Sequence, residues 1–126
     1  LSRIMLGIKS VLAENDEIET LIFDEIDTGI SGRTAQKVSE QLSGIAGHHQ
    51  IICITHLAQI AAMADTHFVI DKQTDGLTTE TIIKELKDHE IIDELARILG
   101  GAAITDRVID NAKEMKELAM SSKKYK

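Results

Sequence analysis

Two adjacent carboxylates follow an apolar run in the first quarter of the chain, in the order Leu21-Ile22-Phe23-Asp24-Glu25. Large apolar residues without polar alternation are typical of a strand buried on both faces, as in a parallel sheet. Ligands of open α/β sheets bind at the carboxyl ends of such strands, where Asp24 and Glu25 fall. A divalent cation on Asp24 would offset the repulsion between the two carboxylates, and Glu25 could then accept a proton from water. The alternative is an acidic junction of two solvated side chains.

A second apolar run, Ile51-Ile52-Cys53-Ile54, ends in Thr55 and His56. Between the two runs, apolar residues at helical spacing predict a helix from Ser31 to Ala46. A strand, a helix and a strand over this length predict a βαβ unit with a right-handed crossover and two neighbouring parallel strands, 19–24 and 50–54. Asp24, Glu25 and His56 should therefore lie at one edge of the sheet, within reach of a common ligand.

The rest of the chain predicts elements that support this unit. An apolar stripe predicts an amphipathic helix over 1–13, and an Ala-rich stretch predicts a short helix over 57–63. Asp75-Gly76 favours a tight turn, so 66–71 and 79–86 are expected to form a hairpin around the loop 72–78. Two more helices are expected over 91–99 and 104–115, the second capped by Thr105. The stripe of the first helix consists of Ile4, Met5, Ile8, Val11 and Leu12.

Composition limits the class of protein and its partners. The 126 residues, 43% of them apolar and 28% charged, are ordinary for one soluble globular domain. No apolar run approaches the roughly 20 residues of a membrane span. The net charge of −7 argues against a nucleic-acid-binding surface on this stretch alone. The single Cys53 is expected to be a buried, inert thiol, which fits a reducing cytosolic setting.

Three segments together resemble the motifs of ABC-type ATPases. Residues 21–25 look like a Walker B strand, 27–31 like the D-loop that follows it, and 51–56 like the strand and switch histidine of the H-loop. Ile26 stands where membrane transporters carry Pro, which resembles the SMC-like branch. Within this branch, stretches spread over almost the whole chain resemble the RecN family of DNA repair proteins. These stretches are residues 1–6, 24–32, 54–61 and 94–101.

The resemblance implies a fold and a domain organisation. It implies that residues 1–126 form an α/β domain, the C-terminal lobe of a P-loop ABC-type ATPase head. Such a lobe has a mostly parallel sheet, flanking helices and a terminal β-hairpin. The sequence contains no Gly-x-x-x-x-Gly-Lys-Ser/Thr loop for phosphates and no Ser-Gly-Gly signature. The resemblance therefore implies that the N-terminal half of the head is a required partner.

The resemblance also implies roles for individual residues and for ATP and Mg²⁺ as cofactors. Asp24 would hold Mg²⁺ through a water molecule, Glu25 would polarise the attacking water, and His56 would contact the γ-phosphate. These roles fit phosphoryl transfer, which needs charge neutralisation and an oriented nucleophile. The cofactor-binding residues would be Asp24 together with three residues of the D-loop, which would face a second head across an ATP-sandwiched homodimer. These three are Asp27, Gly29 and Ser31.

At the level of the whole protein, the resemblance implies ATP hydrolysis during recombinational repair of DNA double-strand breaks. DNA would be bound by the intact protein, in the bacterial cytoplasm at the nucleoid, without a membrane partner. This stretch alone is expected not to hydrolyse ATP.

Two other functions stay open from the residues. One is a self-contained Mg²⁺-dependent phosphotransfer domain that uses Asp24, Glu25 and Asp27. The spacing of Asp24 and Asp27 does not match the Asp-x-Asp of dehalogenase-like phosphatases, and Lys72 is poorly placed for a receiver domain. The other is a non-catalytic dimerisation module, which would form stable dimers without nucleotide.

Overall fold

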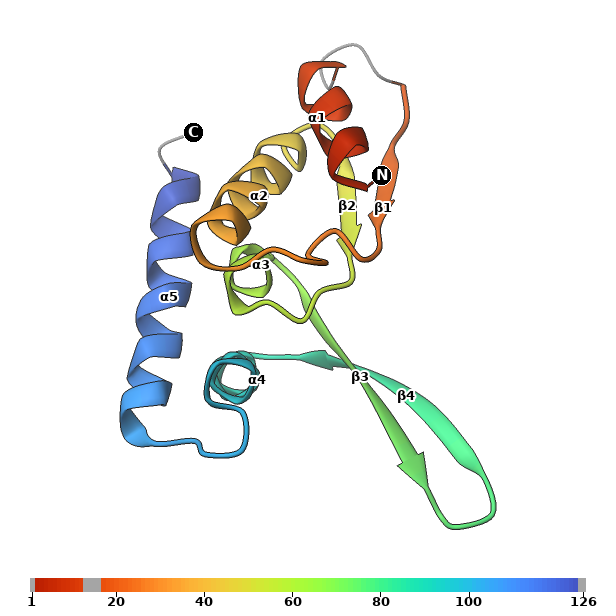
Figure 1. Ribbon diagram of the computed structural model, residues 1–126, viewed down its shortest axis with the longest axis vertical. Helices are drawn as coiled ribbons and strands as arrows, with labels where there is room; N and C mark the ends of the chain where they lie inside the picture. Colours follow the sequence, from red (N-terminus) through yellow and green to blue (C-terminus); the bar gives the residue numbers. More distant parts are fainter. Residues whose placement is uncertain (1, 13–16, 125–126) are drawn as a thin grey trace.

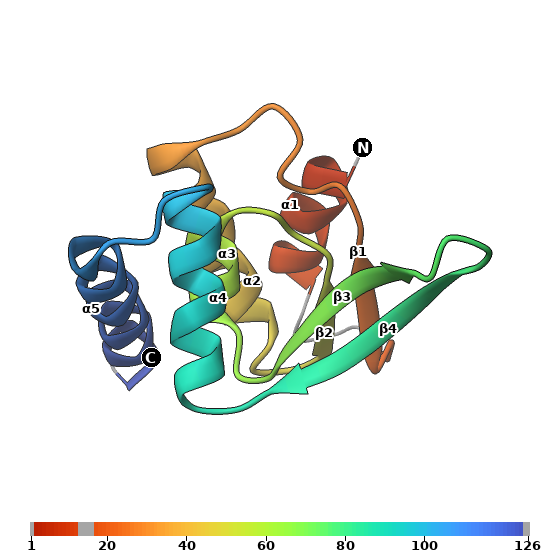
Figure 2. The same ribbon diagram turned by 90° about the horizontal axis from the view of Figure 1, so that it is seen from below.

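A computed structural model describes residues 2–12 and 17–124 of the chain, with five helices and four strands among them. Figures 1 and 2 show the helices gathered on one side of the molecule and the strands on the other. None of the helices within the described residues is long and apolar enough to cross a membrane. The elements in chain order are α1 (Ser2–Leu12), β1 (Thr20–Phe23), α2 (Gly32–Ile45), β2 (Gln50–Cys53), α3 (Ala58–Met63), β3 (His67–Thr74), β4 (Thr79–Leu86), α4 (His89–Gly100) and α5 (Asp106–Lys124).

The two predicted strands of the βαβ unit are parallel neighbours. Thr20 lies opposite Gln50 and Phe23 lies opposite Cys53. Just beyond this register, the amide of Ile54 donates a hydrogen bond to the carbonyl oxygen of Phe23, at 2.9 Å. This confirms the predicted pairing and places the carboxyl ends of β1 and β2 at the same edge.

Helix α2 covers one face of the strand pair, as its apolar stripe predicted. The buried residues on α2 recur at helical spacing, and they pack with Phe23, Ile26 and the α1 residue Leu6 in one apolar cluster. This cluster lies beneath the edge where β1 and β2 end, so the loops that leave this edge rest on a packed base. The α2 residues in the cluster are Val38, Leu42 and Ile45.

The strands form two separate two-stranded sheets, and the expected hairpin is present, but it is not terminal because α4 and α5 follow it. β1 and β2 form a parallel pair, whereas β3 and β4 form an antiparallel pair. The hairpin of β3 and β4 projects away from the helices in Figure 1. Its strands pair with each other because Gly76 adopts a φ of +92° and Asp75 Oδ1 accepts the amides of Leu77 and Thr78. The loop is shorter than predicted, since β3 continues to Thr74.

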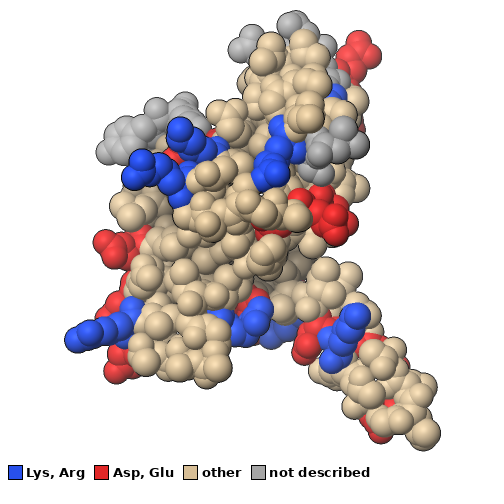
Figure 3. All heavy atoms as spheres, viewed as in Figure 1, with Lys and Arg blue, Asp and Glu red and all other residues tan. Residues whose placement is uncertain are grey.

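The opposite face of the parallel pair and the outer side of α1 leave apolar side chains exposed. Ile22 and Ile52, which lie opposite each other, are 68% and 46% exposed. The five residues of the predicted apolar stripe of α1 are all exposed, so the stripe does not face the core. Leu6 faces the core instead. The surface over α1 carries few charged side chains (Figure 3). Helical spacing correctly grouped these residues on one face, but no described residue covers that face.

A second apolar cluster joins α3, α4 and α5. Leu95 and Ala96 of α4 and Ala112 of α5 are at most 1% exposed, and they pack with residues of α3. The small side chains allow the three helices to approach closely. Helix α5 starts at Asp106, and Thr105 Oγ1 accepts the amide of Val108 at 3.4 Å, at the position where a cap was predicted.

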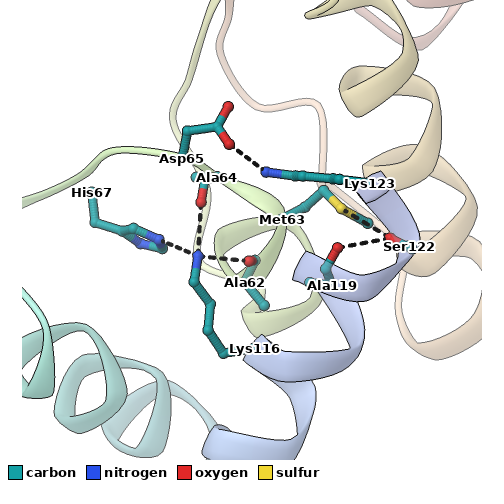
Figure 4. Close-up of polar contacts among 9 residues, drawn as sticks. All are labelled: Ala62, Met63, Ala64, Asp65, His67, Lys116, Ala119, Ser122 and Lys123. Atoms are coloured by element: carbon teal, nitrogen blue, oxygen red, sulfur yellow. Dashed lines mark hydrogen bonds and ion pairs between the residues drawn. The ribbon is translucent and has the colours of Figure 1, made fainter. Parts of the chain in front are cut away.

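Lys116 ties α5 to the end of α3 and to the start of β3 (Figure 4). Its Nζ donates to the carbonyl oxygens of Ala62 and Ala64, at 3.0 and 2.7 Å, and lies 3.0 Å from His67 Nε2. Burial lowers the pKa of His67, and the positive charge of Lys116 lowers it further. The positive charge of Lys123 also lowers the pKa of His67, whereas the negative charge of Asp65 raises it. The imidazole is therefore held in its neutral form, with Nε2 as the acceptor.

We predict that the folded state loses stability as the pH falls below the ordinary His67 value of 6.5. The unfolded chain binds this proton more readily than the folded chain does, so acid favours unfolding in this range. Denaturant unfolding of the chain between pH 7 and pH 5.5 should show a smaller pH slope for His67→Gln than for the unaltered chain. His48→Gln, at an exposed histidine, is the matched control. An unchanged slope in His67→Gln would contradict the prediction.

Candidate functional site

The predicted polar residues gather at the carboxyl edge of β1 and β2. Asp24 follows the last residue of β1, and His56 lies three residues after the end of β2. Burial raises the pKa of Cys53 to about 11, and the negative charges of Asp27 and Asp24 raise it further. The thiol is therefore protonated at neutral pH, as expected for an inert thiol, but Cys53 is half-buried and not fully buried as predicted. The effect of Asp24 and Asp27 on the Cys53 thiol indicates that both carboxylates place negative charge near this edge of the sheet.

Asp27 connects the loop after β1 to the loop after β2. Its side chain is 3% exposed. One carboxylate oxygen, Oδ2, accepts a hydrogen bond from Thr55 Oγ1 at 2.6 Å and another from the amide of His56 at 2.9 Å. The same oxygen lies 3.1 Å from His56 Nδ1. Thr55 Oγ1 in turn accepts the amide of Leu57 at 3.1 Å, just before α3 begins.

Asp27 stays ionised in its buried position. Burial raises the pKa of a carboxyl group, but the hydrogen bonds from Thr55 and His56 outweigh this effect. A smaller contribution comes from the charge of the His56 ring, and the resulting pKa of Asp27 is below its ordinary value of 3.8. The site therefore holds a fixed negative charge directly behind the histidine.

His56 presents its imidazole to the outside. The side chain is 76% exposed although Nδ1 faces the buried carboxylate. Because Nδ1 lies 3.1 Å from the buried carboxylate, Nε2 is the ring nitrogen that a ligand at this edge would meet.

Glu25 is held in an unusual backbone conformation. Its φ is +56°, in the left-handed region that residues with a Cβ rarely adopt. Among the described non-glycine residues only Asp88, before α4, shares a positive φ. The turn is fixed by hydrogen bonds from the Thr28 amide to the Glu25 carbonyl and from the Ile30 amide to the Asp27 carbonyl, each at 3.3 Å. Such strain persists where the surroundings impose it, and it is frequent at functional sites.

The remaining predicted residues lie at the surface of the same edge. Asp24, Glu25, Gly29 and Ser31 are exposed, and Gly29 has a φ of +71°, which a glycine adopts without strain. The described residues contain no group of three or more side chains that could hold a metal ion by themselves. Asp24 fits a cation that takes its other ligands from water and phosphate oxygens, which is how Mg²⁺ usually binds.

The sequence indicated the edge correctly but missed how its residues are connected. Asp27 was predicted as a cofactor-binding residue, and the structure shows its carboxylate bonded to Thr55 and His56 of the same chain. Thr55 was placed at this edge without a role. No pattern in the sequence distinguishes a buried carboxylate from an exposed one in this loop. The strain at Glu25 depends on the turn and likewise has no sequence signal.

The fold and the site define a small α/β protein whose ionisable residues meet at the carboxyl edge of a parallel strand pair. No protein-family model matches the chain. Over 98% of its length it is 43% identical to the DNA repair protein RecN of Halalkalibacterium halodurans, of which it covers 22%. It is 44% identical to the RecN proteins of Bacillus subtilis and Treponema pallidum, over 91% of the chain and 20% of each relative.

The chain belongs to the RecN family. It spans about a fifth of the length of the curated relatives it matches.

We predict that Glu25→Gly makes the chain more stable than Glu25→Ala, by about 1 kcal/mol, because only glycine adopts the left-handed conformation without steric cost. Both substitutions remove the same carboxylate, so their difference isolates the backbone contribution. Thermal and denaturant unfolding of the two variants measures it. An alanine variant as stable as the glycine variant would show that residue 25 is not strained.

Proposed function

We propose that the chain is one lobe of the ATP-hydrolysing head of a RecN-type DNA repair protein. The observation that carries the proposal is the arrangement at the edge of β1 and β2. An exposed carboxylate pair follows one strand, and an exposed histidine held by a buried carboxylate follows its parallel neighbour. Substrates of α/β sheets bind at this edge.

In this proposal each residue has a distinct task in hydrolysis. The water oxygen forms a bond to the γ-phosphorus, the bond from phosphorus to the bridging oxygen breaks, and ADP leaves with that oxygen. Glu25 orients the water and accepts its proton, and His56 contacts an oxygen of the γ-phosphate. Bound Mg²⁺ would neutralise phosphate charge, and Asp24 would hold it through water.

An uncovered sheet face and an unpaired strand edge support the proposal that the chain is a lobe that packs against the rest of a longer protein. Parallel sheets are normally covered on both faces, yet Ile22 and Ile52 face outward. In the described residues, the outer edge of β2 is paired with no strand. The phosphate-binding loop that the chain lacks would come from that remainder, as a strand and loop added beside β2. Gly29 and Ser31, both exposed, would face the nucleotide of a second head.

The relatives are named DNA repair proteins, and we extend this role to the chain. The net charge of −7 supports DNA contacts elsewhere in the longer protein, because phosphate neutralisation needs clustered basic residues. We place the intact protein in the cytoplasm, associated with the bacterial nucleoid.

The structure argues against a self-contained phosphotransfer domain. That function needs Asp24, Glu25 and Asp27 as joint cation ligands. Asp27 is buried, and its Oδ2 already accepts hydrogen bonds from Thr55 and His56. A dimerisation module without catalysis offers no reason for a strained, exposed Glu25.

We predict that Glu25→Gln, in the longer protein that contains this chain, lowers the rate of phosphate release at least about 100-fold and spares ATP binding. Glutamine keeps the shape of the side chain but cannot accept the proton. Glu80→Gln on the exposed β4 is the matched control and should keep full activity. An equal loss of ATP affinity and turnover in Glu25→Gln would make Glu25 a binding residue.

The 126-residue chain alone should release no phosphate from ATP above the level of its own Glu25→Gln variant. It has residues to orient water and to contact the γ-phosphate, but it has no loop to position the β- and γ-phosphates. Turnover that Glu25→Gln eliminates would instead favour a complete site within the chain.

A further inference from the structure

We propose that Asp27 is a positioning residue that fixes the orientation and the tautomer of His56, and that it makes no direct contact with nucleotide. This inference rests on the proposed function, because it assigns how the histidine of that site is held. It differs from the role that the D-loop resemblance implies for Asp27.

Burial keeps a ligand away from the carboxylate of Asp27. The Asp27 side chain is 3% exposed, whereas the His56 side chain beside it is 76% exposed. A phosphate or a partner chain arriving at this edge would meet the imidazole and not the carboxylate. An ionised carboxylate would also repel a phosphate at contact distance.

Three groups that can donate hydrogen bonds converge on one oxygen atom of Asp27. The Thr55 hydroxyl, the His56 amide and His56 Nδ1 all lie within 3.1 Å of Asp27 Oδ2. The first two are hydrogen bonds that fix the backbone around the histidine, and the third is a charge contact that places the ring nitrogen against the carboxylate. A carboxylate that served only to connect the loops would not need the ring nitrogen.

The consequence for His56 is chemical as well as geometric. An ionised Asp27 accepts hydrogen bonds and cannot donate them, so its position 3.1 Å from Nδ1 favours the tautomer with the hydrogen on Nδ1. The neutral ring then has a bare Nε2, and the imidazolium has an Nε2–H, directed outward in both cases. This arrangement matches that of a catalytic histidine oriented by a buried carboxylate behind it.

The tautomer of His56 is the direct test, and it requires no turnover. The longer protein, labelled with ¹⁵N-histidine, gives imidazole nitrogen signals, of which those of His56 are identified by their loss in His56→Gln. We expect the Nδ1–H form to predominate in the unaltered protein and to give way to the Nε2–H form in Asp27→Ala. Thr55→Val removes a neighbouring donor but keeps the carboxylate, so it should keep the Nδ1–H form.

Kinetics provide a second, independent test through a double-mutant cycle. Asp27→Ala should lower kcat for ATP hydrolysis about 10- to 100-fold with KM changed by less than about twofold, since misplacement of a catalytic group costs this much. In the His56→Gln background the same substitution should have almost no further effect. If Asp27→Ala does not fold, Asp27→Asn replaces it. In that variant a neutral oxygen can keep the geometry, and we expect a smaller loss that again vanishes in His56→Gln.

The outcomes separate this inference from the proposed function. An Nε2–H tautomer in the unaltered protein, or losses that multiply in the double variant, would overturn the role of Asp27 even if Glu25→Gln is inactive. Absence of ATP hydrolysis in the unaltered protein would overturn the proposed function, and the tautomer measurement would still decide whether Asp27 holds the ring. A raised KM with unchanged kcat in Asp27→Ala would assign Asp27 to nucleotide binding and overturn the proposal.

Discussion

The buried carboxylate of Asp27 is the interaction on which the arrangement of the site depends. An ionised carboxylate away from water is unfavourable unless hydrogen bonds replace its hydration. Two donors come from consecutive residues after β2, so burial of the charge and docking of the two loops occur together. Hydrogen bonds to a charged group contribute about 1.5–3 kcal/mol each. This one side chain therefore links the loops at the ends of the two strands, in addition to the apolar packing of Ile26 and Leu57.

The same constraint accounts for the strain at Glu25. Phe23 is fixed in β1 by its pairing with β2, and Asp27 is fixed by its donors four residues later. The intervening residues must reverse the chain within this distance, and Glu25 takes the left-handed conformation that the reversal requires. A glycine would suit the backbone better, so the sequence retains a carboxylate at a steric cost. In the proposed function this carboxylate accepts the proton of the attacking water, and a conflict with local conformational preference is expected at functional sites.

Sequence reasoning succeeded where the pattern itself determines the structure. The parallel pairing of β1 and β2, the buried stripe of α2 and the hairpin turn at Gly76 follow from periodicity and turn chemistry. It failed where a partner decides the outcome. Helical spacing grouped the apolar residues of α1, but it could not show that the chain itself leaves them exposed. It predicted the edge where the polar residues meet, but a loop sequence does not reveal which of its carboxylates turns inward.

Helix α3 connects the loop that carries His56 to both apolar clusters of the molecule. It begins at Ala58, two residues after His56, and the Thr55 hydroxyl accepts the amide of Leu57 between them. Ile60 of α3 belongs to the apolar cluster beneath the strand ends, whereas Ala62 belongs to the cluster of α4 and α5. Lys116 of α5 binds the carbonyl oxygens at the end of the same short helix. Because cores are close-packed, α3 could not move without disturbing both clusters. The backbone of His56 is thus bonded to a buried carboxylate and followed closely by a packed helix.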